Sequence, residues 1–285
     1  MKWDTLYNLS GRVAVVTGAS YGLGVTFAQV LADAGADVAI FARSADKLEE
    51  TRKTIEERGR RCLVVTGDVT RFEDVQRLMD QTVATLGGVD ILVNNAGVSD
   101  TTLGRAERVD PASFEEILRT DLVGVWHGCR AAGPHMLRQG GGSIINLSSI
   151  FGGAGAEHRN AAYFAAKGGV NQLTRLLACE WADRNVRINA LAPNLLLSEM
   201  SRELIEQSGL DDWFASRTPM RRMGEVDELI GPFLFLASDA SSFVTGIVLN
   251  VDGGWGASGG YAQLPQPWDD WGELGKPILK GDKDA

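Results

Sequence analysis

The 285-residue sequence has few of the residues that metal centres and disulfide frameworks require. It contains three histidines, which form no metal-binding pattern, and three cysteines, which lie far apart. The residues concerned are His127, His135, His158, Cys62, Cys129 and Cys179. An odd number of cysteines without motif spacing excludes a zinc site or a disulfide framework. We therefore expect no metal, and a reducing compartment.

The sequence also lacks a basic excess and a long apolar run. It has 28 Lys and Arg residues against 37 Asp and Glu residues, for a net charge of −9. A surface that binds nucleic acid needs the opposite balance. No apolar run reaches the roughly 20 residues of a membrane span. The first 18 residues show no basic region followed by an apolar stretch and a cleavage site, so they are not a signal peptide. We expect a cytoplasmic protein with neither nucleic acid nor membrane as partner.

Proline is scarce, with 8 residues, whereas glycine is abundant, with 34. This pairing indicates tight turns between regular elements. The apolar fraction of 44% and the charged fraction of 23% are those of ordinary globular chains, which excludes disorder. No composition break marks a second domain. We predict one domain over residues 1–256 and a C-terminal tail over residues 257–285, whose Trp268 and Trp271 favour docking on the body or on a neighbouring subunit.

Seven short apolar runs have the character of strands that are buried on both faces. They lie at Val13–Thr17, Asp37–Ala42, Cys62–Thr66, Asp90–Asn94, Ser143–Leu147, Val186–Leu191 and Ile247–Val251. Helical patterns alternate with them, at about Gly22–Gly35, Ala45–Arg58 and Arg71–Leu86. This alternation predicts an α/β fold: a doubly wound, seven-stranded parallel sheet with helices on both faces. The polar, irregular segment Ser198–Met223 departs from it and is expected to be a lid.

A glycine-rich loop follows the first predicted strand. It reads Thr17-Gly18-Ala19-Ser20-Tyr21-Gly22-Leu23-Gly24, and a predicted helix begins within it. Glycines allow a pyrophosphate to approach the backbone amides, and the helix N-terminus supplies free N–H donors. The loop therefore predicts a dinucleotide site; the alternative is a glycine-rich turn without a ligand.

The chain resembles the short-chain dehydrogenase/reductase family in its single-domain form, from about Leu9 to Gly254. The motifs that carry the resemblance are Thr-Gly-x-x-x-Gly-x-Gly, Asp68-Val69, Asn94-Asn95-Ala96-Gly97, Ser149 and Tyr163-x-x-x-Lys167, in that order. The resemblance implies a Rossmann-like fold and an NAD(P)-dependent enzyme that interconverts a secondary alcohol and a ketone. Relatives are commonly tetramers, so a homo-oligomer, tetramer or dimer, is expected.

By this resemblance the cofactor lies along the carboxyl edge of the sheet. The residues expected to contact it are Gly18, Ser20, Tyr21, Gly22, Leu23, Gly24, Arg43, Ser44, Asp68, Val69, Asn95, Ala96, Gly97, Tyr163, Lys167, Pro193, Leu196 and Ser198. An NAD site usually has an acid at the end of the second strand. Here Ala42 takes that place and Arg43 follows, and a guanidinium can hold a 2′-phosphate. We expect NADP to be favoured. NAD stays as the alternative, because Tyr21 stands where many NADP-using relatives have a second basic residue.

Tyr163 and Lys167 are four residues apart in a helical pattern over Asn160–Trp181, which places them on one helix face. The ammonium favours the phenolate, so Tyr163 is expected to be the general acid and base. By resemblance Ser149, or its neighbour Ser148, positions the substrate oxygen. Asp121 stands where the family usually has an asparagine that supports a proton relay to the lysine.

Further candidates lie around this set. Asn194 replaces the usual glycine after Pro193, and its side chain is expected to narrow the site or to donate to the substrate. The charged insert Glu157-His158-Arg159 is either a recognition segment for a polar or anionic substrate group, with His158 and Arg159 as contacts, or a solvated turn. One rival function is a cofactor-binding protein with little catalysis. The other, a sugar-nucleotide epimerase, requires a larger substrate lobe.

Overall fold

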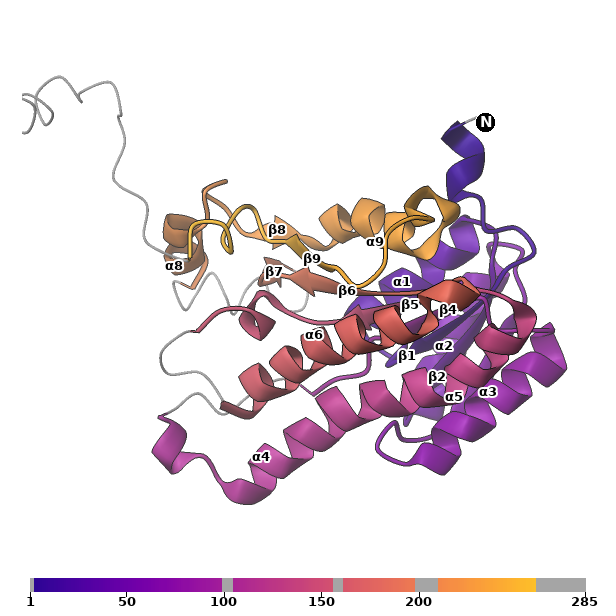
Figure 1. Cartoon of the computed structure of the whole chain (residues 1–285), viewed down its shortest axis with the longest axis horizontal. Helices are drawn as coiled ribbons and strands as arrows, with labels where there is room; N and C mark the ends of the chain where they lie inside the picture. The colour runs from indigo at the N-terminus through magenta and orange to yellow at the C-terminus, as the bar shows by residue number, and fades with distance from the viewer. Residues whose placement is uncertain (1–2, 99–104, 156–160, 198–209, 260–285) are drawn as a thin grey trace, which may run out of the picture.

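Seven parallel strands form the central sheet of the computed structural model, which describes residues 3–98, 105–155, 161–197 and 210–259 (Figure 1). The order across the sheet is β3-β2-β1-β4-β5-β6-β9. The strands are β1 (Val13–Thr17), β2 (Asp37–Ala42), β3 (Cys62–Thr66), β4 (Ile91–Asn94), β5 (Gly142–Leu147), β6 (Val186–Pro193) and β9 (Val248–Val251). The predicted doubly wound sheet is confirmed, with strand bounds that differ by at most two residues.

Burial on both faces explains why the strands are almost continuously apolar. In β1, Ala14 and Val16 pack on one side of the sheet, and Val13 and Val15 pack on the other. Each set belongs to a separate apolar cluster, one beneath α1, α2 and α9 and the other beneath α3, α5 and α6. Alternate side chains of a strand point to opposite faces, so a strand between two helical layers has no polar side.

Helices cover both faces of the sheet (Figure 1). The α-helices are α1 (Gly22–Asp33), α2 (Ala45–Glu56), α3 (Phe72–Leu86), α4 (Pro111–Leu118), α5 (Gly124–Gln139), α6 (Ala161–Trp181), α8 (Leu210–Arg217) and α9 (Ile230–Ala237). The short 3₁₀ helices are η1 (Trp3–Tyr7), η2 (Ala106–Arg108), η4 (Ile150–Gly152), η5 (Ala182–Arg184), η6 (Val226–Leu229) and η7 (Asp239–Ser241). α1 ends at Asp33, two residues before the predicted end at Gly35, and Gly35 has a φ of +104° that suits a residue just after a helix.

α4 and α5 are joined without a break by a π-helical turn, η3 (Arg119–Val123). The whole stretch therefore runs as one helix from Pro111 to Gln139, begun by Asp110, whose carboxylate accepts a hydrogen bond from the Ser113 N–H. The turn contains Asp121, which is buried. The wider turn was not predicted by the sequence pattern.

The segment after β6 is more regular than predicted in its described part. The short strands β7 (Leu196–Leu197) and β8 (Gly224–Glu225) pair with each other, and α8 lies between them. The interpretation of Ser198–Met223 as wholly irregular is therefore wrong for this part, and residues 198–209 lie outside the described residues. The tail from residue 260 onward also lies outside them, so the division into one domain and a tail stays a prediction.

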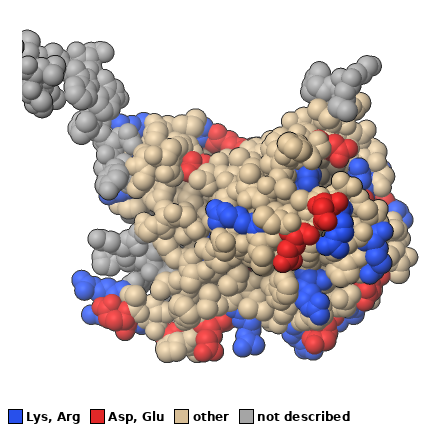
Figure 2. Space-filling model, in the orientation of Figure 1, with Lys and Arg blue, Asp and Glu red and all other residues tan. Residues whose placement is uncertain are grey.

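The surface in Figure 2 carries acidic and basic side chains intermingled around the end of the molecule where α3 and α5 lie. The middle of this face has few charged side chains. Among the helices of the described residues, none has the length and apolar character that crossing a bilayer requires.

Candidate active site

The glycine-rich loop joins β1 to α1 and lies against the end of β2. The Gly18 N–H donates to the Phe41 carbonyl oxygen at 2.7 Å, and the Asn95 amide donates to the carbonyl oxygens of Thr17 and Gly18 at 3.0 and 3.2 Å. A Cβ at Gly24 would lie 2.2 Å from the Gly18 carbonyl oxygen. The loop can therefore fold back on its own helix only because residue 24 is glycine.

The described geometry fits the pyrophosphate of a dinucleotide. Tyr21 is the residue before the first turn of α1 and makes no side-chain hydrogen bond to the helix end. Gly22 has a φ of +54°, and a Cβ placed there would meet no atom within 4 Å. No side-chain cap engages the first N–H groups of α1, so an anion at this helix end can accept from them.

The motifs after β3 and β4 form the floor beside this loop. Thr17 Oγ1 accepts from the Asn95 and Ala96 N–H groups, both at 3.1 Å, which joins the glycine loop to the loop after β4. The Asp68 carboxylate accepts from the Thr70 N–H at 2.9 Å, and Val69 is buried. The glycine loop and the loop after β4 therefore meet at the carboxyl edge of the sheet, and Asp68 and Val69 follow β3 at the same edge.

At the end of β2, Ala42 is half-buried and Arg43 is exposed. Within the described residues no hydrogen bond or ion pair engages the Arg43 guanidinium. Ser44 precedes α2 and its side chain makes no hydrogen bond to the helix end. The exposed Tyr21 ring lies nearby in the glycine loop, and the Lys47 Nζ lies 5.9 Å from its centroid. This last contact was not predicted from the sequence.

Lys167 is the centre of the predicted catalytic group. Its Nζ lies 5.4 Å from the centroid of the Tyr163 ring, 3.3 Å from Asp121 Oδ2 and 3.0 Å from the Leu147 carbonyl oxygen, to which it donates. Lys167 and Asp121 are both buried, at 6% and 1% exposure. Asp121 Oδ1 also accepts from the Val98 N–H at 2.8 Å. The structure thus brings Tyr163, Lys167 and Asp121 together at the end of β5.

The two serines after β5 differ in their surroundings. Ser148 Oγ donates to Asn171 Oδ1 at 2.6 Å and is also 3.5 Å from the Lys167 carbonyl oxygen. Ser149 Oγ accepts from the Phe151 N–H at 3.3 Å, and no described acceptor takes its own proton. Among the described residues, the hydroxyl proton of Ser148 is therefore engaged within the chain and that of Ser149 is not.

The segment after β6 borders the same edge. Asn194 is 9% exposed, and its Oδ1 accepts from the Leu195 N–H at 2.7 Å, which leaves the amide N–H groups to donate. Pro193 ends β6, and Leu196 is half-buried in β7. His158, Arg159 and Ser198 lie outside the described residues.

An aromatic cluster beside the catalytic group was missed by the sequence reasoning. Phe151 stacks on Phe164 with centroids 4.9 Å apart, and the Trp255 ring meets Phe151 edge-on at 5.8 Å. Trp255 is 3% exposed, and its Nε1 has no hydrogen-bond partner in the described part of the chain. The positions of Phe151 and Phe164, beside Ser149 and Tyr163, were the available signal.

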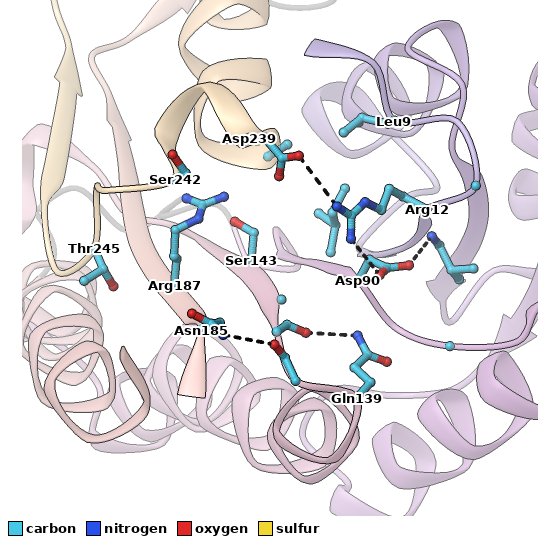
Figure 3. Close-up of a pocket in the computed structure, with 18 of the residues that line it drawn as sticks. Leu9, Arg12, Asp90, Gln139, Ser143, Asn185, Arg187, Asp239, Ser242 and Thr245 are labelled. Carbon is cyan, nitrogen blue, oxygen red and sulfur yellow. Dashed lines mark hydrogen bonds and ion pairs between the residues drawn. The ribbon is translucent and has the colours of Figure 1, made fainter. Parts of the chain in front are cut away.

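A cavity of about 900 Å³ lies at the opposite, amino edge of the sheet (Figure 3). Its most buried cation, Arg187, donates to four oxygens of the chain itself, between 2.7 and 3.5 Å. Arg12 is engaged by Asp90 at 3.4 Å and by Asp239 at 3.7 Å. Both arginines thus have partners within the chain, and the cavity offers no comparable nucleophile or acid–base pair. In the described ranges, no three His, Cys, Asp or Glu side chains gather in a way that could hold a metal.

Comparison with known proteins agrees with this geometry. Residues 18–256 match the family model described as enoyl-(acyl carrier protein) reductase. The chain is 37% identical to gluconate 5-dehydrogenase of Gluconobacter oxydans, covering 89% of this chain and 98% of that one, and 37% identical to galactitol 2-dehydrogenase of Cereibacter sphaeroides, covering 90% and 99%. A crystal structure of gluconate 5-dehydrogenase from Burkholderia cenocepacia, in complex with NADP and tartrate, superposes with a TM-score of 0.83 at 36% identity, covering 90% and 99% of the two chains. With its motifs, its fold and these relatives in agreement, the chain belongs to the short-chain dehydrogenase/reductase family.

Proposed function

We propose that the chain interconverts a secondary alcohol and a ketone, with Tyr163 as the general acid and base. Membership of the family makes it an NAD(P)-dependent oxidoreductase. The observation that carries the finer proposal is the position of the Lys167 ammonium, 5.4 Å from the centroid of the Tyr163 ring and held from behind by the Leu147 carbonyl oxygen and Asp121. A positive charge beside a phenol stabilises its ionised form, which is the form that accepts a proton from an alcohol.

Each residue of the group then has one task. Bound nicotinamide supplies the hydride acceptor or donor. Tyr163 Oη takes the proton from the substrate hydroxyl during oxidation and returns it to the carbonyl oxygen during reduction. Ser149 Oγ donates a hydrogen bond to the same substrate oxygen and fixes its orientation. Asp121 Oδ2 lies 3.3 Å from the Lys167 Nζ, so the carboxylate belongs to the same group and supports the proton relay to the lysine by holding the ammonium in place.

NADP is the proposed preferred cofactor. The end of β2 carries Arg43 and Ser44 and has Ala42 in place of an acid, so a 2′-phosphate finds a cation and meets no carboxylate at that position. Two gluconate 5-dehydrogenases with similar structures, from Burkholderia cenocepacia and Beutenbergia cavernae, were crystallised with NADP.

The substrate is proposed at the level of its reacting group. The named substrates of the relatives differ widely, from gluconate and galactitol to an acyl chain on a carrier protein. What these names share is oxidation of a carbinol or reduction of a ketone. Asn194, with free amide N–H groups at the edge of the site, is the proposed donor to a polar group of the substrate.

We further propose a cytoplasmic homo-oligomer. The three cysteines are unpaired, which suits a reducing compartment. Val123 and Trp126 on one helical stretch and Leu176 on α6 expose large apolar surfaces, at 37%, 40% and 54%, which suits contact with further copies of the chain.

The replacement Tyr163→Phe tests the function. It keeps the ring beside Lys167 and removes the hydroxyl, so turnover should fall by about 10²–10⁴-fold. A screen of secondary alcohols and ketones, followed by the absorbance of the reduced cofactor, first identifies a substrate for the unmodified protein. Cofactor affinity, titrated by fluorescence, should stay within about twofold, which serves as the control for folding.

The alternative is a cofactor-binding protein with little catalysis, which the substitutions at Asp121 and Asn194 favour. It predicts cofactor binding without turnover on any compound of the screen. Near-normal turnover of the Tyr163→Phe variant would instead remove Tyr163 from the mechanism.

A further inference from the structure

A lysine of α2 reaches the glycine loop from the side. Lys47 is the third residue of α2, and its Nζ lies 5.9 Å from the centroid of the Tyr21 ring. That distance is within the range in which an ammonium is attracted by an aromatic face. Tyr21 is 55% exposed, so its ring is available to such a contact from the outside of the loop.

α2 is fastened to the loop, which makes this proximity a property of the fold. Thr51 Oγ1, one turn after Lys47, donates to the Ala19 carbonyl oxygen at 2.9 Å and is buried. The N–H groups of Gly18 and Ala19 donate to the carbonyl oxygen of Phe41, at 2.7 and 3.3 Å. The first turn of α2, the loop and the end of β2 therefore form one fixed corner, and Arg43 and Ser44 lie in it.

Lys47 is charged, and its ion pair with Glu50 is exposed to solvent. Its ammonium donates to the carboxylate of Glu50 at 2.9 and 3.1 Å, and this contact raises the pKa of Lys47. The two side chains are 40% and 63% exposed. Exposed ion pairs of this kind contribute little stability, so an incoming dianion is able to take the lysine from Glu50.

We propose that Lys47 is a second cation for the 2′-phosphate of NADP, positioned by the ring of Tyr21. The inference rests on the proposed preference for NADP. Arg43 approaches the phosphate from the end of β2, and Lys47 approaches it from the first turn of α2. The two positive charges of these side chains would then balance the two negative charges of the 2′-phosphate. Lys47 thereby supplies the second positive charge that a basic residue at the position of Tyr21 would provide.

The experiment measures affinity for adenosine 2′,5′-bisphosphate and for adenosine 5′-monophosphate, which differ in the 2′-phosphate and carry no nicotinamide. Titration calorimetry on the full chain gives both dissociation constants for the variants Lys47→Ala, Lys53→Ala, Tyr21→Phe, Tyr21→Leu and Arg43→Ala. Lys53 lies in the last turn of the same helix and is the matched control for loss of a positive charge.

We expect Lys47→Ala to weaken the bisphosphate about threefold to tenfold and the monophosphate less than twofold, the scale of one partly exposed charge pair. Lys53→Ala should change neither. The preference is expressed as the dissociation constant of the monophosphate divided by that of the bisphosphate. Tyr21→Phe keeps the ring face and should keep this ratio, whereas Tyr21→Leu should reduce it. The loss should shrink as ionic strength rises from about 0.05 to 0.5 M, because salt screens exposed charges.

An unchanged ratio in Lys47→Ala, whether neither ligand or both ligands bind more weakly, overturns the role of Lys47. An unchanged ratio in Tyr21→Leu overturns positioning of Lys47 by the Tyr21 ring. Arg43→Ala separates these failures from a failure of the NADP proposal. If Arg43→Ala lowers the ratio while Lys47→Ala does not, the 2′-phosphate site stands without Lys47. If neither lowers it, the site itself is refuted.

Discussion

Replacement of Asp121 by asparagine gives the sharpest test of how the catalytic group works. Asp121 is 1% exposed; its Oδ2 lies 3.3 Å from the Lys167 Nζ and its Oδ1 accepts from the Val98 N–H at 2.8 Å. Asparagine, the usual family residue, has nearly the same shape and keeps an oxygen that accepts from the Val98 N–H. Asp121→Asn therefore removes one negative charge from the group while retaining its packing.

The size of the effect follows from the distances. Asp121 and the Tyr163 ring flank the same ammonium, at 3.3 and 5.4 Å from its nitrogen. For an assumed separation on the order of 8 Å between carboxylate and phenolate, two negative charges repel by about 2 kcal/mol at an effective dielectric constant of about 20. Ionisation of the phenol is opposed by the carboxylate, so removal of the carboxylate should move the rising, low-pH limb of the alcohol-oxidation profile to lower pH.

The assay is the pH dependence of alcohol oxidation at saturating cofactor, recorded for the unmodified protein, Asp121→Asn and Asp121→Ala. Asp121→Asn should stay active, with its profile moved to lower pH. Asp121→Ala should lose activity, and it should also unfold more easily, because removal of one member of a buried ion pair costs about 3–5 kcal/mol. Thermal unfolding of both variants separates these effects. Profiles and turnover that are unchanged in both variants, or a shift of Asp121→Asn to higher pH, would refute the reasoning.

Two further predictions concern groups away from the catalytic centre. Burial opposes ionisation of Asp37, but the Arg61 N–H and two guanidinium groups outweigh it and lower its pKa. Asp37→Asn should therefore cost about 1–2 kcal/mol in urea unfolding at pH 7, and the difference should shrink as the pH falls below the ordinary carboxyl pKa of 3.8 and the wild-type carboxyl is protonated; a constant difference would contradict the ion-pair account. Burial also raises the pKa of the Cys129 and Cys62 thiols to about 12, so a thiol reagent should label only the exposed Cys179 in the native protein and all three cysteines in denaturant, as counted by mass spectrometry.

The strands were predictable from the sequence because burial on both faces leaves little choice of residue. Val13–Thr17 and Asp37–Ala42 were predicted with the bounds that the structure shows. The ends were less certain where neighbours extend a strand, as at β6, which continues to Pro193 because β9 pairs with its last four residues. The predicted helix from Ala45 ends at Glu56, two residues earlier than expected.

The candidate site was predictable as a set of motifs but not as a set of contacts. The sequence placed Tyr163 and Lys167 on one helix face, since that follows from helical spacing alone. It could not show that Ser148 is engaged by Asn171, because those residues meet only through the packing of β5 against α6. The approach of Lys47 to Tyr21 likewise depends on how α2 docks on the glycine loop.

The π-helical turn at Arg119–Val123 has a consequence for the phase of the helix that contains it. Each residue of an α-helix advances the side chains by about 100° around the axis, and a π turn holds one residue more than an α turn. Deletion of one residue from this turn would rotate the side chains on one side of the deletion by about 100° relative to those on the other side. The buried carboxylate of Asp121 would then swing away from Lys167 by about a quarter of a revolution. The extra residue thus changes which side chains face the body of the protein after the turn. The half of the helix before it and the half after it can therefore pack on different neighbouring elements.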